Sequence, residues 1–178
     1  TARAGMDTDI SYIADLGFTY RPVDRFSMDF DLGFVQSKNW YLHQEDRNFT
    51  SFDSLQVRPG LSMDYFISAN QQLRFTLQWI GITGDGKERW SVPFEPGRLL
   101  PRYDDDGALS DDFAVSQMTS QLRYRWEIAP LSDLFVVYTR GSNLPNRVDD
   151  EFGALFEDAF NQPIVDVFTV KLRYRFSS

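Results

Sequence analysis

The sequence predicts an all-β fold, an antiparallel up-and-down transmembrane β-barrel, and three observations support this prediction. Seven segments alternate apolar and polar side chains with the two-residue period of a strand. The connections between them alternate between short turns and long polar loops, as expected when every second hairpin faces the opposite side of a membrane. Aromatic residues gather near both ends of the segments, where a barrel meets the two membrane interfaces.

The first four predicted strands cover residues 9–21, 26–34, 55–65 and 73–80. Pro22 presets the backbone of the short turn between the first two, and residues 68–70 form the turn between the next two. Pro59 cannot donate a hydrogen bond to a neighbouring strand, so it predicts a bulge or a locally unpaired position.

Three further strands are predicted at residues 115–128, 134–140 and 166–176. Residues 129–133 form a short turn, whereas residues 36–54, 83–112 and 142–163 form the long loops. A short helix fits within residues 151–160. A compact soluble domain rarely carries three loops of this length.

The last strand has the sharpest pattern. One of its faces is apolar and aromatic, and the other carries Lys171, Arg173 and Arg175. Ending on Tyr174 and Phe176, it resembles the closing strand of bacterial outer-membrane barrels, whose terminal aromatic is an assembly signal. Alternation alone also fits the last strand of a soluble sheet.

Two belts of aromatic side chains favour the barrel over an immunoglobulin-like sandwich of seven strands, which gives no reason for such belts. The belt at the short-turn end consists of Tyr20, Phe26, Tyr65, Tyr124, Trp126, Tyr174 and Phe176. The belt at the long-loop end consists of Tyr12, Phe34, Trp40 and Trp79.

Seven is an odd number, whereas single-chain bacterial outer-membrane barrels have an even one, and an open edge in lipid leaves backbone groups unsatisfied. We therefore expect residues 1–178 to be the C-terminal part of a larger barrel, or to be completed by a second chain.

Charge is distributed unevenly along the chain. The net charge is −8, and the acidic excess lies in the three long loops. The predicted polar face carries residues that would line a hydrated interior, where they could orient a solute or simply pair with one another. These residues are Arg123, Arg125, Lys171, Arg173, Arg175, Asp15, Asp29 and Asp31.

Other chemistry has little support in the sequence. Cysteine is absent, which excludes disulfides and thiolate sites. The one histidine, His43, with Asp46 or Ser51, is the only candidate for a hydrolase at the rim of the barrel. Asp104, Asp105 and Asp106, with Asp111 and Asp112 nearby, form a weak Ca²⁺ candidate, for which a solvated loop is the simpler interpretation. No basic patch of the nucleic-acid-binding kind is present.

Two segments carry a family resemblance. Residues 121–141, clearest at Trp126, Pro130 and Ser132–Tyr138, together with V-K-L-R-Y-R-F at residues 170–176, resemble the C-terminal barrel region of a bacterial family of unknown function. That family typically places a family-9-like carbohydrate-binding module before an outer-membrane barrel. The resemblance implies an N-terminal portion ahead of residue 1 and gives no activity to transfer.

From these observations we expect a non-enzymatic pore or surface scaffold of the bacterial outer membrane, without a cofactor, that admits or presents a solute or glycan. The alternative is a membrane anchor whose acidic loops bind another envelope protein. In either case the expected surroundings are outer-membrane lipid, lipopolysaccharide and the barrel assembly machinery.

Overall fold

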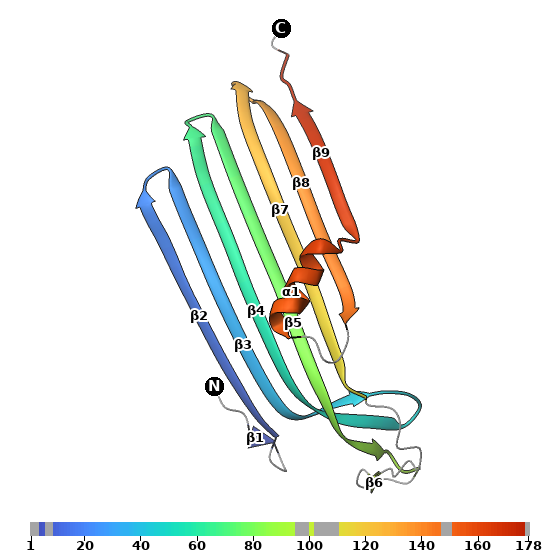
Figure 1. Ribbon diagram of the computed structural model, residues 1–178. Coiled ribbons are helices and arrows are strands. Elements are labelled where there is room, and N and C mark those ends of the chain that lie inside the picture. Colours follow the sequence, from blue (N-terminus) through green and yellow to red (C-terminus); the bar gives the residue numbers. More distant parts are fainter. Residues whose placement is uncertain (1–3, 6–8, 95–99, 102–110, 147–150, 177–178) are drawn as a thin grey trace.

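The computed structural model describes residues 4–5, 9–94, 100–101, 111–146 and 151–176 and shows one antiparallel sheet (Figure 1). Every long strand pairs with the next long strand in chain order, so the predicted seven-stranded up-and-down topology is confirmed. The two-residue strands β1 (Ala4–Gly5) and β6 (Leu100–Pro101) pair with β2 and β5. The seven long strands are β2 (Asp9–Val23), β3 (Phe26–His43), β4 (Asn48–Ser68), β5 (Gln71–Ser91), β7 (Phe113–Ala129), β8 (Ser132–Asn146) and β9 (Val165–Arg173).

The sheet is open. Within the described residues, β2 with its short neighbour β1 forms one edge and β9 forms the other, and the two edges are not paired. These seven strands therefore do not close into a barrel by themselves. Each edge strand presents backbone N–H and C=O groups, so closure would require further strands at both edges.

Strands β3, β4 and β5 are longer than their sequence patterns predicted. β3 runs to His43 and β4 starts at Asn48, so most of the predicted loop 36–54 is a hairpin. β5 likewise continues through Ser91, into the predicted loop 83–112. The register shifts between Ser37 and Trp40, and Asn39 there has a φ of 54°, so the alternation is interrupted. Trp40 and Leu42, which the sequence allowed as a continuation of the strand, both belong to β3.

Pro59 interrupts pairing on one side only. Toward β3, Pro59 is paired with Leu32. Toward β5, Val57 pairs with Gly81 and Gly60 pairs with Gln78, and the two residues between them, Arg58 and Pro59, are unpaired. The register is the same before and after this gap. The proline therefore produces a locally unpaired position rather than a bulge, one of the two outcomes the sequence predicted.

The strand register creates two chemically different faces. One cross-strand row is apolar in all seven long strands: Tyr20, Met28, Met63, Phe75, Leu122, Tyr138 and Phe168. The adjoining row on the other face is polar in six of them: Thr19, Asp29, Ser62, Thr76, Gln121, Thr139 and Val167. We call these the apolar face and the polar face.

Helix α1 (Phe152–Asn161) confirms the predicted short helix and packs across β5, β7 and β8 (Figure 1). It covers the apolar face at the end away from the short turns. Trp79 Nε1 donates to Ser116 Oγ over 2.8 Å, and Ser116 Oγ donates to the Leu155 carbonyl over 2.7 Å. The buried residues of this contact are Trp79, Ala114, Met118, Leu155 and Ala159.

Replacing Leu155 by alanine should loosen α1. Leu155 is fully buried, and truncating a buried leucine costs about 2–5 kcal/mol. We expect faster amide hydrogen exchange over residues 152–161, with little change at the short-turn end of the sheet. Exposed Glu157→Ala is the matched control. Equal exchange in both variants would show that the helix is held by other contacts.

Candidate functional site

A hollow on the polar face, formed by β2, β3 and β4, is the candidate site. Two cross-strand rows build it: Gly17, Asp31 and Gly60 form one, and Asp15, Gly33 and Arg58 form the next. Glycine and charged side chains therefore alternate along each row and between rows. A glycine inside a strand often marks a place where another group approaches the backbone closely.

The glycines give the two carboxylates room to lie against the sheet. A Cβ atom at Gly17 would be 2.6 Å from Asp31 Oδ1, and one at Gly33 would be 2.8 Å from Asp15 Oδ1. Both separations are shorter than ordinary non-bonded contacts. A larger residue at Gly17 or Gly33 would therefore displace the neighbouring carboxylate.

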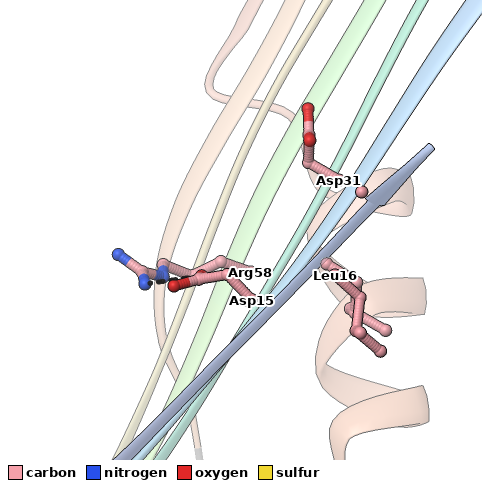
Figure 2. A pocket seen from close by; sticks show the side chains of 7 residues that line it. Asp15, Leu16, Asp31 and Arg58 are labelled. Atoms are coloured by element: carbon pink, nitrogen blue, oxygen red, sulfur yellow. Dashed lines mark ion pairs between the residues drawn. The ribbon is translucent and has the colours of Figure 1, made fainter. Parts of the chain in front are cut away.

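The charged groups of the hollow are weakly engaged. The Arg58 guanidinium lies 3.6 Å from Asp15 Oδ1 (Figure 2), and both side chains are exposed. Such a pair contributes little because water screens it. Among the described residues, the Asp31 carboxylate has neither a hydrogen bond nor an ion pair. The hollow therefore contains a carboxylate and a guanidinium that are available to a solute.

The hollow has a volume of about 340 Å³ and adjoins a second one of about 440 Å³. Asp31 and Arg58 line both of them. In the second hollow, the row of Asp31 continues through Gln78 and Thr119 on β5 and β7. Hydrogen-bonding groups thus extend across the polar face at one level.

Leu16 follows Asp15 in the sequence, but its side chain lies on the other side of β2. Figure 2 shows Asp15 and Arg58 reaching away from one side of the strand and Leu16 away from the other. Leu16 is 66% exposed, although it is an aliphatic residue in the middle of a strand. The hollow therefore lies behind an apolar surface that is itself largely uncovered.

The register places seven of the eight charges singled out in the sequence on the polar face, but their surroundings differ. Asp15 and Asp31 line the hollow, whereas Asp29 accepts a 2.6 Å hydrogen bond from Thr19. Arg123 lies directly opposite Arg74, which is paired with Asp64. Lys171 and Arg173 belong to β9, and Arg125 belongs to β7. Arg175 lies beyond the end of β9, and its backbone N–H donates to Ser132 Oγ.

Two of the predicted interior cations are held by a buried carboxylate. Arg125 Nε and a terminal nitrogen of its guanidinium each lie 3.0 Å from Asp133 Oδ1, and Arg173 contacts Asp133 Oδ2. Asp133 and Ser132 are buried beside the turn between β7 and β8. The sequence placed Arg125 and Arg173 on the wall of the interior, but it did not identify Asp133 as their partner. We call these three residues the Asp133 clamp.

The clamp joins β9 to the hairpin of β7 and β8. Arg125 of β7 and Arg173 of β9 contact the same carboxylate, which belongs to β8.

The residues of the hydrolase candidate and of the Ca²⁺ candidate that the structure describes form hydrogen bonds or ion pairs with neighbouring strands and turns. His43 Nε2 lies 3.0 Å from the backbone oxygen of Asp46, and buried Ser51 bonds to the backbone of Glu88, so both side chains are engaged away from any nucleophile–base pair. Asp104, Asp105 and Asp106 lie outside the described residues. Asp111 binds Arg89 and Thr50, and Asp112 accepts the backbone N–H of Gly86.

The aromatic belts are only partly as predicted. Three members of the short-turn belt lie in one cross-strand row: Phe26, Tyr65 and Tyr124. Trp79 is buried beneath α1, and Trp40 packs against Phe113 in a cluster near Phe52, so neither remains on the open apolar face.

The chain end also differs from its prediction. Tyr174 and Phe176 lie beyond Arg173, the last residue of β9, rather than inside a strand as the sequence predicted. Their rings contact each other edge to face, with centroids 5.0 Å apart, and Phe176 is 87% exposed.

The fold and the hollow define a class of protein: an open meander of long antiparallel strands with one apolar face, one polar face and a charged hollow in the polar one. Within the described residues, no helix is long and apolar enough to cross a membrane. A family model described as a domain of unknown function, DUF5916, matches residues 2–176, and the chain belongs to this family. No curated protein and no solved structure matches the chain.

The match supports one part of the family resemblance, membership of a family of unknown function. Residues 121–141 and 170–176 resembled a family of unknown function, and the matching family model has that description over nearly the whole chain. Sequence reasoning missed Arg58 and Asp133, because their partners lie on other strands: Asp15 and Arg173 are distant in the chain, and Arg125 lies across the hairpin of β7 and β8. The glycines at positions 17, 33 and 60, within strand patterns, were the available signal for the hollow.

Proposed function

We propose that this chain forms part of the wall of an outer-membrane β-barrel, with its apolar face toward lipid and its polar face lining a passage for small solutes. The observation that carries this proposal is the uncovered apolar face. Large apolar side chains on this face are exposed in both edge strands: Leu16 and Phe18 in β2, and Phe168, Val170 and Leu172 in β9. A soluble monomer rarely exposes a contiguous apolar surface of this extent.

The dimensions of the apolar face support the same proposal. From the turn row near Ala129 to Met118, where α1 begins to cover the sheet, β7 has about as many residues as the ~9–11 that a tilted spanning strand needs. Beyond that level the strands continue, β4 and β5 reaching 21 residues each. On this proposal α1 lies outside the membrane, over the part of the strands that projects from it.

The polar face supports a passage. Charged side chains such as Asp31, Arg58 and Lys171 would be costly in lipid and are tolerated in a hydrated interior. The Asp133 clamp is part of the wall and holds two of the cations in place. The remaining charges and the hollow then determine what the interior attracts.

Both edges of the sheet need partners in this setting, because unpaired backbone groups are not tolerated in lipid. We propose that additional strands of the same polypeptide supply them. The family resemblance, which implies a preceding portion with a family-9-like carbohydrate-binding module, supports this choice. A second copy or another chain is the alternative source.

The test combines membrane fractionation, electrophoresis with and without boiling, and the intact mass of the native protein. We expect a membrane-bound species whose mobility shifts on heating and whose mass is well above the 20.7 kDa of these residues. A membrane-bound, heat-shifting species of 20.7 kDa would point to closure by several copies. A soluble 20.7 kDa species without a shift would overturn the proposal.

One observation favours a second function, an anchor that binds a partner protein. The far ends of β3, β4 and β5 form an extension with its own packed centre, in which Thr50, Ser51 and Phe52 are buried. A folded extension of this kind provides a surface beyond the proposed membrane. Deleting residues 39–52 should then abolish complex formation while conductance remains.

A further inference from the structure

We propose that the hollow around Asp31 binds small organic cations, solutes that carry a primary amine or a guanidinium group. This inference deepens the proposed passage and rests on it. The Asp31 carboxylate occupies the hollow without a partner among the described residues. An incoming ammonium group can therefore bind it without displacing an existing bond.

Charge at the hollow favours a cation over an anion. Asp15, Asp31 and Arg58 together carry one net negative charge, and Arg58 already lies 3.6 Å from Asp15. An anionic solute could reach the Arg58 guanidinium, but the Asp15 and Asp31 carboxylates would both repel it. A cationic solute meets an available carboxylate, and hydrogen bonds between ionised groups are the strong ones.

The glycines determine the shape of the site. Gly17 and Gly60 lie on either side of Asp31 in the same row and leave the backbone bare there. The Asp31 carboxylate lies over Gly17, because a Cβ atom at that position would be 2.6 Å from Oδ1. The group is therefore held near the wall, with the two adjoining hollows open beside it.

Asp29 provides an internal comparison. It is two residues from Asp31 on the same strand and the same face, but its Oδ1 accepts a 2.6 Å hydrogen bond from Thr19. Simple attraction of cations by negative charge would involve both carboxylates. A specific site involves Asp31 alone.

The experiment measures n-pentylammonium binding to the detergent-solubilised full-length protein by equilibrium dialysis, and in parallel its reduction of K⁺ current through the protein in a planar bilayer. Pentanoate and pentanol are the anionic and neutral comparison probes. We expect pentylammonium to bind most tightly and Asp31→Asn to weaken its binding roughly tenfold. The control Asp29→Asn should remain within about twofold of the wild type.

Gly17→Ala tests the geometry without changing the charge. Its methyl group displaces the Asp31 carboxylate, so we expect binding to weaken here too, whereas long-range attraction alone would leave it unchanged. Equal affinity in the wild type and Asp31→Asn, or tighter binding of pentanoate, would overturn the inference. Dialysis binding without any conductance would leave the cation site standing and remove the passage, whereas conductance without pentylammonium binding would do the reverse.

Discussion

Val170→Arg should prevent stable membrane insertion, whereas Thr169→Arg should be tolerated. The two residues are neighbours on β9, but Val170 lies on the apolar face and Thr169 on the polar face, in register with Val136 and Val137 of β8. Arginine facing lipid near the middle of a membrane costs about 2–4 kcal/mol, and the cost is small toward a hydrated interior.

The measurement is the fraction of each variant that is membrane-bound and shifts on heating. Both substitutions add the same side chain to the same edge strand, so a difference between them reports the surroundings of each face. In a soluble sheet the result would be the opposite. Val170 is 58% exposed, and an arginine there would then improve solubility.

Asp133→Asn should lower the fraction of the heat-resistant folded species. The substitution removes the negative charge between Arg125 and Arg173 and leaves two guanidinium groups beside a buried amide. The Arg125 and Arg173 side chains are 46% and 62% exposed, so water compensates part of their charge, but a neutral amide accepts weaker hydrogen bonds from them than the carboxylate does. Glu127→Gln is the control, since Glu127 lies opposite Asp133 in the register. Similar loss in both variants would mean that net charge near the turn matters rather than the clamp.

The clamp changes what neutralising the basic residues should do. From the sequence, Arg123, Arg125, Lys171, Arg173 and Arg175 were grouped as charges that line a hydrated interior and could orient a solute. Because Arg125 and Arg173 are bound by Asp133, their loss should reduce stability first. Lys171 carries its charge into the space beside the polar face from an edge strand, so its effect on selectivity should be easier to separate from assembly.

The two-residue alternation in residues 9–34, 55–80, 115–140 and 166–173 was sufficient to predict seven antiparallel strands and two faces. A strand fixes the side of each side chain by position alone, so Asp15, Asp31 and Arg123 could be assigned to the same face from their spacing. The helix near residues 151–160 was likewise predicted from local sequence.

Register and cross-strand neighbours were decided only in the tertiary structure. The full lengths of β3, β4 and β5 were not predicted, because register shifts after Ser37 and between Ser51 and Phe52 interrupt the alternation while the backbone continues to pair. The partners of Arg125, Arg58 and Trp79 come from other strands or from α1, and alternation carries no information about which residues become opposite. The sequence therefore determined the strands and their two faces, whereas the hollow, the Asp133 clamp and the helix-covered end depend on contacts between distant segments.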